Sequence, residues 1–212
     1  MIKVLLIDDH PVVRRGLCQI LTEDPGILVG GEASTGAQAM ARVQAERWDV
    51  ILLDISLPDA NGIELIASIR SVRPEARVLI LTVFGEEQYA VRAIRAGAAG
   101  YLTKESAPDK LVEAVRKVAG GGRYVSAELA ESLASILAGE AEGAPHERLS
   151  DREFDVFKRL VSGRTVSEIA EELGLSVKTI STHRTRILGK MQMRNNAELM
   201  HYAARTRLLE SP

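Results

Sequence analysis

The sequence is poor in cysteine and in long apolar runs, and each shortage excludes a class of protein. Cys18 is the single cysteine among 212 residues, so the chain can form neither an internal disulfide nor a cysteine-based metal site. No stretch approaches the roughly 18 apolar residues that a membrane span requires. The N-terminal MIKVLLIDDH turns acidic too early for a signal peptide. We therefore expect a soluble, cytoplasmic protein that does not enter a membrane.

Charge is unevenly distributed along the chain, although the formal net charge is only −2. Residues 1–147 carry 15 Lys and Arg against 21 Asp and Glu, whereas residues 148–212 carry 12 against 8. The two parts therefore have net charges of −6 and +4, which sum to −2. An acidic first part joined to a basic second part indicates two roles, with nucleic acid a candidate partner of the basic part.

Apolar runs alternate with stretches of helical length through the first 120 residues. Runs that are apolar at nearly every position are typical of strands buried on both faces of a parallel sheet. They fall at residues 2–7, 27–31, 50–53, 78–81 and 98–102. The helical stretches fall at about 11–22, 35–47, 61–73, 86–96 and 107–119. Five strand–helix repeats predict an α/β fold, a doubly wound five-stranded parallel sheet.

The alternation stops at the three glycines that begin at Gly120, and helical patterns follow. We expect a linker over residues 121–147 that contains a helix at about 126–138, supported by Leu129, Leu133, Ile136 and Leu137 at helical spacing. Four helix starts come next: the capping-box pairs Ser150–Glu153 and Thr165–Glu168, then Ser176, then Asn195 or Asn196. The sequence thus predicts a domain at 1–120 and a small all-α four-helix domain at 148–212.

Polar side chains follow four of the predicted strands. Asp8 and Asp9 follow the first strand, Asp54 the third, Thr82 the fourth and Lys104 the fifth. Parallel strands bring all five to one rim of the sheet, where ligands of open α/β folds bind. Three carboxylates repel one another and one lysine cannot neutralise them, so the group implies a proton or a divalent cation such as Mg²⁺. The alternative is that each acid caps the helix that follows it.

Residues 1–120 resemble the receiver domain of bacterial two-component response regulators, which is flavodoxin-like in fold. The residues that carry the resemblance are LLIDDH, ILLDISLPDANGIE, LILTVF and GYLTKE, which occur in the family's order. The resemblance implies that Asp54 accepts a phosphoryl group from a sensor histidine kinase. It further implies that Mg²⁺ is bound by Asp9, Asp54 and the backbone carbonyl of Ser56, with Asp8 acting largely through water.

The same resemblance implies a switch around the phosphorylated residue. Lys104 would neutralise a phosphoryl oxygen, the Thr82 hydroxyl would bond it, and Tyr101 occupies the position of the family's switch aromatic. The alternative for Tyr101 is a half-exposed strand tyrosine that does not move. Glu105 stands where the family usually has proline, and whether the 104–105 peptide bond is cis stays open.

Two predicted helices of the basic part have helix-turn-helix proportions. They lie at about 165–173 and 177–190 and are joined by Gly174-Leu175-Ser176. On the second helix, apolar residues share one stripe and polar residues share the opposite face. A compact polar face suits the DNA major groove, and it equally suits solvent, so periodicity leaves both open.

Residues 149–191 resemble the LuxR-type helix-turn-helix, so the whole chain resembles a NarL/FixJ-type response regulator. The resemblance implies promoter DNA as a partner, a homodimer when phosphorylated, dimer contacts by a helix at about 195–205, and no enzyme activity. The implied DNA contacts are Lys178, Thr179, Ser181, Thr182, Thr185 and Arg186. Ser181 stands where lysine is usual and Val166-Ser167 replace Asn-Lys, which predicts a shallower salt dependence of DNA binding. His183 can face this site or pack beside the apolar stripe.

The expected function is transcriptional regulation through phosphorylation of Asp54. Two alternatives remain at this point. In one, the first domain acts only as a dimerisation module, and DNA affinity ignores phosphorylation. In the other, the protein works through protein contacts, and its basic domain never occupies DNA.

Overall fold

The computed structural model describes residues 1–83, 86–127, 129–131, 134, 144–206 and 208. The chain divides into two compact units, Met1–Ala138 and Gly139–Pro212. Among the described helices, none combines the length and the apolar character needed to cross a membrane.

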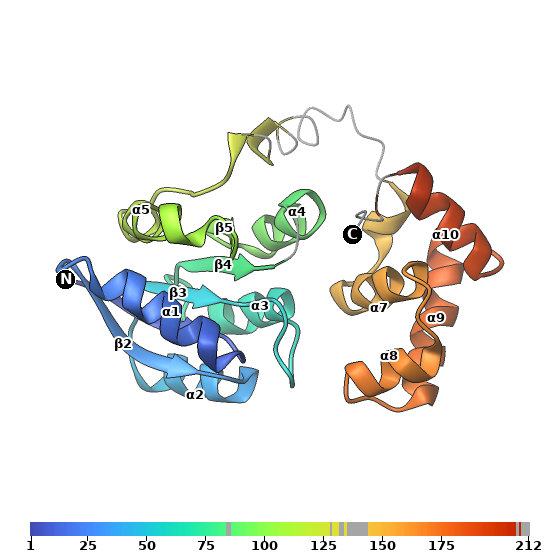
Figure 1. Cartoon of the computed structure of the whole chain (residues 1–212), viewed down its shortest axis with the longest axis horizontal. Helices are drawn as coiled ribbons and strands as arrows, with labels where there is room; N and C mark the ends of the chain where they lie inside the picture. The colour runs from blue at the N-terminus through green and yellow to red at the C-terminus, as the bar shows by residue number, and fades with distance from the viewer. Residues whose placement is uncertain (84–85, 128, 132–133, 135–143, 207, 209–212) are drawn as a thin grey trace. The chain divides into compact units, whose positions relative to one another are not determined.

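The first unit contains a five-stranded parallel sheet in the order β2-β1-β3-β4-β5 (Figure 1). Its strands are β1 (Ile2–Ile7), β2 (Ile27–Ala33), β3 (Val50–Leu53), β4 (Val78–Thr82) and β5 (Gly100–Thr103). Its helices are α1 (Pro11–Thr22), α2 (Gly36–Ala45), α3 (Gly62–Val72), α4 (Glu86–Ala96) and α5 (Ala107–Ala119). The predicted alternation and the doubly wound α/β fold are confirmed.

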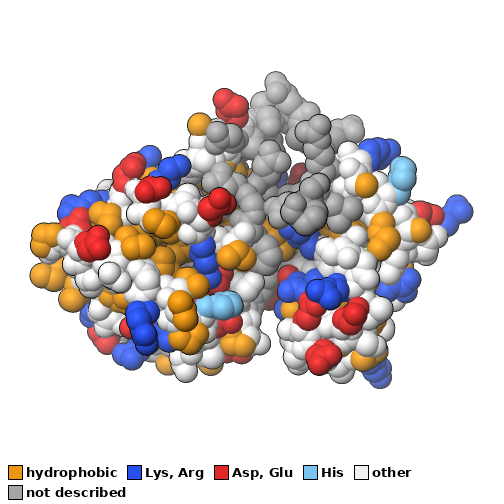
Figure 2. All heavy atoms as spheres, viewed as in Figure 1, with side chains coloured by type: hydrophobic (Ala, Val, Ile, Leu, Met, Phe, Trp, Pro, Cys, Tyr) orange, Lys and Arg blue, Asp and Glu red, His pale blue; other side chains and the backbone are white. Residues whose placement is uncertain are grey.

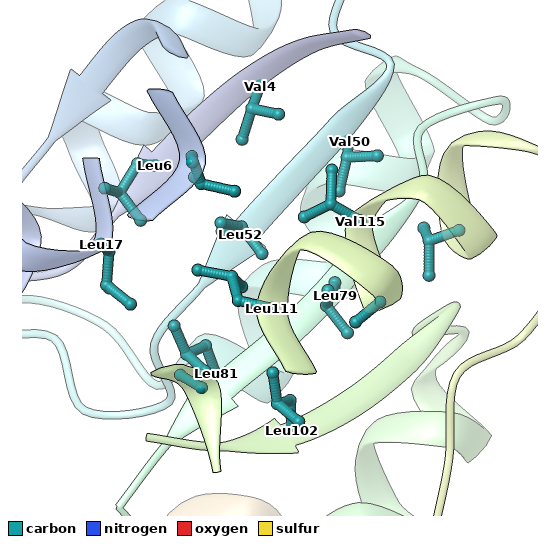
Figure 3. Close-up of a cluster of buried hydrophobic side chains, with 14 of the residues drawn as sticks. Val4, Leu6, Leu17, Val50, Leu52, Leu79, Leu81, Leu102, Leu111 and Val115 are labelled. Atoms are coloured by element: carbon teal, nitrogen blue, oxygen red, sulfur yellow. The ribbon is translucent and has the colours of Figure 1, made fainter. Parts of the chain in front are cut away.

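Helices cover both faces of the sheet, α1 and α5 on one and α2, α3 and α4 on the other (Figure 1). Every second residue of the central strands points toward α1 and α5, where Leu6 and Leu52 meet Leu17 and Leu111 (Figure 3). All positions of β3 and β4 are buried, because helices pack on each side of them. Burial on both faces explains why these strands are apolar without alternation.

The two outer strands differ from their predicted bounds. Strand β2 runs on to Ala33 and alternates between buried and exposed positions, as expected of a strand at the border of the sheet. Strand β5 begins only at Gly100, because the Ala98 N–H is bonded to the Ala93 carbonyl at 2.9 Å in the turn that ends α4. Neither difference in strand bounds affects the polar residues that the sequence predicts at the rim of the sheet.

The segment after α5 returns to the outer edge of β5, which is an edge strand of the sheet. Gly120 and Gly121 end α5, and Tyr124 then pairs with Gly100 as an isolated parallel bridge. The Tyr124 N–H is 3.0 Å from the Ala99 carbonyl, and the Tyr124 carbonyl is 2.9 Å from the Tyr101 N–H. Residues 127, 129–131 and 134 of the predicted 126–138 helix are helical, whereas Leu133, Ile136 and Leu137 lie outside the described residues.

The second unit is helical over its described residues, as predicted. Its elements are the 3-10 helix η1 (Pro145–Arg148), α7 (Asp151–Val161), α8 (Val166–Glu172), α9 (Val177–Met191) and α10 (Asn196–Arg205). The predicted caps form: Ser150 and Thr165 make complete capping boxes, and Ser176 and Asn195 accept hydrogen bonds from the first turns of α9 and α10. Gly163 and Gly174 follow α7 and α8 with φ of 86° and 62°, a conformation that glycine adopts without strain.

Candidate functional site: a carboxylate cluster and a helix-turn-helix

Strand register brings the predicted rim residues together. Ile7 pairs with Leu53, so Asp8 and Asp54 leave their neighbouring strands side by side. Thr82 pairs with Thr103, and the Lys104 N–H then donates to the Thr82 carbonyl at 2.7 Å. Because β3 lies between β1 and β4, Asp54 stands between the acids of β1 and the lysine that follows β5.

Lys104 joins the two buried carboxylates. Its Nζ lies 2.7 Å from Asp8 Oδ2 and 2.6 Å from Asp54 Oδ2. The side chains of Asp8 and Asp54 are only 2% and 3% exposed. The acids that the sequence predicts at one rim of the sheet therefore lie together, and the cluster of Asp8, Asp9, Asp54 and Lys104 is called the notch below. One cation faces two buried anions, and Asp9 adds a third nearby, so the notch retains negative charge.

Burial dominates the electrostatics of Asp54. It raises the pKa of the Asp54 carboxyl above its ordinary value, the Lys104 ammonium opposes the rise, and the Asp8 charge adds to it. Burial lowers the pKa of Lys104, but its contacts with Asp54 and Asp8 outweigh burial and hold that pKa above its ordinary value. Lys104 therefore stays charged, whereas burial and the Asp8 charge disfavour the ionised form of Asp54 and Lys104 favours it.

Asp9 lies nearer to solvent and has a different partner. Its side chain is 31% exposed, and Asp9 Oδ1 lies 2.6 Å from Nδ1 of His10. One donor atom each from Asp8, Asp9, His10 and Asp54 lie within 4.8 Å of one another, a separation that one metal ion can span. Sequence reasoning missed His10, although its place directly after two acids was a usable signal.

The loop after β3 packs tightly beneath Asp54. The Ser56 N–H donates to Asp54 Oδ1 at 3.3 Å, and Ser56 forms an isolated bridge with Asn61. Asn61 caps α3 by accepting from the Ile63 N–H at 2.9 Å. A Cβ added to Gly62 would lie 2.3 Å from the Asp54 carbonyl oxygen, so only glycine fits against this backbone. Ser56 is thereby held beside the Asp54 carboxylate.

Thr82 and Tyr101 are both buried, with 0% and 1% exposure. Tyr101 is therefore not half-exposed; its ring lies inside the fold. The Lys104–Glu105 peptide bond is trans, in keeping with the absence of proline at Glu105.

The predicted DNA contacts lie along α9. Lys178, Ser181, Thr182, Thr185 and Arg186 are exposed. The hydroxyls of Thr182 and Thr185 donate to the carbonyls four residues earlier at 2.9 and 3.0 Å.

Other residues of α9 face inward or stabilise the helix. Thr179 is only partly exposed, and its hydroxyl lies 2.8 Å from the hydroxyl of the capping residue Ser176. His183 is half-buried. Ile180, Ile187 and Met191 are buried and fix which side of α9 faces the core.

Acidic and basic side chains mix on the visible face of the second unit. Figure 2 shows Lys and Arg beside Asp and Glu there, without a continuous basic patch. The Lys190 ammonium is 2.5 Å from Glu153 Oε2, an ion pair that sequence reasoning missed. Lys178 and Arg186 are exposed basic side chains of α9 that take no part in this ion pair.

Comparison with known proteins assigns each unit. Residues 4–116 match the response regulator receiver domain, and residues 147–203 match the bacterial regulatory proteins of the luxR family. The response regulator UvrY of Escherichia coli O6:H1 is 39% identical over 206 residues, which cover 97% of this chain and 94% of that protein.

Solved structures give the same assignment. RcsB from Salmonella enterica serovar Typhimurium, bound to promoter rprA in the presence of the phosphomimetic BeF3−, is similar with a TM-score of 0.66 and 25% identity. That similarity covers 96% of this chain and 98% of the RcsB chain. A second structure, of two RcsB dimers on two parallel DNAs, has a TM-score of 0.59 and 25% identity over the same shares of the two chains.

Proposed function

The chain belongs to the two-component response regulators that join a receiver domain to a LuxR-type DNA-binding domain, and from that membership we propose that phosphorylation of Asp54 controls its binding to promoter DNA. The observation that carries the proposal is the pair of salt bridges from Lys104 to Asp8 and to Asp54 at the ends of β1, β3 and β5. The partners are a sensor histidine kinase and double-stranded DNA, and the protein acts as a regulator rather than as an enzyme.

The proposed reaction moves a phosphoryl group to Asp54. A carboxylate oxygen of Asp54 forms a bond to phosphorus while the bond from phosphorus to the kinase histidine breaks, and the freed ring nitrogen takes up a proton. Such transfers depend mainly on positioning and on neutralising charge. Lys104 is fixed beside Asp54 and supplies a positive charge for the phosphoryl oxygens.

The donor set of this notch fits a divalent cation. In our proposal, which follows the family resemblance, Asp9, Asp54 and the Ser56 carbonyl hold Mg²⁺, and Asp8 acts largely through water. The bound ion supplies charge neutralisation at the phosphoryl oxygens. The oxygen-rich, partly exposed cluster supports this assignment.

The proposed switch runs through β4 and β5. A phosphoryl group adds about 1.5 to 2 negative charges and three acceptor oxygens. The Thr82 hydroxyl bonds one of these oxygens, and the buried position of the Tyr101 ring in β5 is then favoured. This change supports a homodimer with DNA-binding domains available to a promoter.

The proposed domains are 1–120, a linker at 121–147 and 148–212. In the last of these, α9 enters the major groove, with Ser181, Thr182 and Thr185 facing bases and Lys178 and Arg186 near phosphates. Thr179 stands at the start of the same helix. We further propose that the protein works in the cytoplasm.

The first experiment replaces Asp54. Asp54→Asn is expected to abolish labelling by acetyl phosphate and Mg²⁺-dependent binding of beryllofluoride, because the amide cannot form the acyl phosphate. Asp109→Asn, an exposed aspartate at the start of α5, is the matched control and keeps full labelling. Labelling that persists in Asp54→Asn would place the acceptor elsewhere.

The second experiment addresses DNA. Lys178→Ala and Thr182→Ala are each expected to weaken binding to promoter DNA about 5- to 100-fold while circular dichroism stays unchanged. Arg47→Ala removes an exposed cation of the first unit and leaves affinity unchanged. Unaltered affinity in both α9 variants would mean that another surface meets DNA. Equal affinity with and without phosphorylation would mean that the receiver acts only in dimerisation.

A further inference from the structure

The carboxylate oxygens of the notch are not equally available to bind a metal ion. Asp8 Oδ1 accepts from the His10 N–H at 2.8 Å, and Asp8 Oδ2 pairs with Lys104 at 2.7 Å. Asp54 Oδ2 also pairs with Lys104, and Asp54 Oδ1 accepts from Ser56. Asp9 Oδ1 instead lies beside the ring of His10, with His10 Nδ1 at 2.6 Å. The carboxylate most open to an ion is therefore already beside a nitrogen donor.

The spacing of these atoms suits shared coordination. Two neighbouring ligand atoms that each lie about 2.1 Å from an octahedral ion are about 3 Å apart, and two opposite ones are about 4.2 Å apart. One donor atom each from Asp9, His10 and Asp54 lie within 4.8 Å of one another, so small side-chain adjustments bring them to these separations. The His10 side chain is 62% exposed, so its ring can open the short contact to Asp9 by a few tenths of an ångström without disturbing the core.

We propose that His10 Nδ1 is a direct ligand of the divalent ion held by Asp9 and Asp54, and that this nitrogen makes the site favour Mn²⁺ and Co²⁺ over Mg²⁺. The inference rests on the proposed function, which places an ion in this notch. Mg²⁺ is a hard cation that prefers oxygen, whereas imidazole suits first-row transition metals. A ligand set of carboxylates and one imidazole is therefore better matched to the latter.

A direct test uses the unpaired electrons of Mn²⁺ bound to the full chain. Electron spin echo modulation is expected to show coupling to a directly bound ¹⁴N, and protein labelled with ¹⁵N at histidine is expected to show the ¹⁵N frequency instead. His10→Ala removes the coupling. His201→Ala, which replaces an exposed histidine of α10 in the other unit, retains it. Bound Mn²⁺ without histidine coupling in the wild type overturns the proposal.

Calorimetric titration with each ion gives an independent readout. His10→Ala is expected to lower the affinity for Co²⁺ at least tenfold and that for Mg²⁺ less than twofold. Equal losses for the two ions, or no loss for Co²⁺, overturn the proposal, because His10 would then act only through its contact with Asp9. Failure of the wild type to bind Mg²⁺ or to be labelled on Asp54 would instead contradict the proposed function itself.

Discussion

Glu153 joins two helices of the second unit through one carboxylate. Its Oε2 accepts from the Ser150 N–H at 2.7 Å, which closes the capping box of α7, and pairs with Lys190 of α9 at 2.5 Å. Burial tends to raise the pKa of Glu153, but the contacts with Lys190 and Ser150 outweigh it and hold that pKa below the ordinary value of 4.5. The ionised carboxylate is thus stabilised by folding.

We therefore predict that Glu153→Gln destabilises the second unit by about 1–3 kcal/mol at pH 7, because Lys190 loses its anion. A group whose pKa falls on folding stabilises the protein above its unfolded pKa and loses this effect as the pH drops. The difference in unfolding free energy between wild type and variant should therefore shrink below about pH 4.5. Denaturant titrations at pH 7 and pH 4 measure it. A difference that is constant or larger at pH 4 would contradict the assignment.

Individual site residues were predictable where the backbone alone decides their position. Asp8, Asp54 and Lys104 follow strands, so the parallel sheet was sufficient to bring them together. The contact of His10 with Asp9 depends on a side-chain rotamer at the start of α1, and no periodic pattern reports a rotamer.

At the scale of elements, the start of α3 is fixed by contact with the strand before it. Gly62 lies against the backbone of Asp54 and Ile55, where a Cβ would approach within 2.3 and 2.7 Å. Gly16, by contrast, is inside α1 with no atom within 4 Å of an added Cβ. The two glycines offer opposite tests of the same substitution.

We predict that Gly62→Ala destabilises the first unit by about 1–3 kcal/mol and slows labelling of Asp54, because the backbone that holds this residue must shift. Gly16→Ala should stabilise α1 by about 0.5–1 kcal/mol, since alanine is the better helix former. Thermal unfolding and acetyl phosphate labelling of both variants measure these effects. Similar behaviour of the two alanines would show that the packing against Asp54 is not limiting.

Element bounds were predictable to within a few residues because apolar runs and caps mark them. The exceptions have tertiary causes. Strand β2 is half-exposed, so its later part does not read as an apolar run. The Tyr124 bridge requires the chain to return to β5 after α5. A single aromatic residue after three glycines is not a pattern that predicts pairing with a strand.

At the scale of the whole molecule, two units with separate cores predict separate unfolding. The first is an α/β sandwich and the second a helical domain, and the contacts divide the chain at residues 138 and 139. The proposed linker at 121–147 spans that division. Gly62 and Glu153 belong to different units, so we predict that substitutions at these two residues act independently.

Calorimetry of the intact chain should therefore show two transitions. We expect Gly62→Ala to lower the midpoint of one, Glu153→Gln to lower the midpoint of the other, and the double variant to show both shifts unchanged. One transition that both substitutions displace together would demonstrate that the units unfold as a single cooperative body.

The Tyr124 bridge has a mechanical consequence for the connection between the units. Its two backbone hydrogen bonds attach the departing chain to β5, the strand that carries Tyr101 and leads into Lys104. Sliding of β5 along its own axis must either drag Tyr124 with it or break both bonds. The chain that leads to the second unit is thus attached at Tyr124 to the strand that precedes Lys104, the residue paired with Asp54. A displacement of β5 is passed to that chain directly, without passing through a helix.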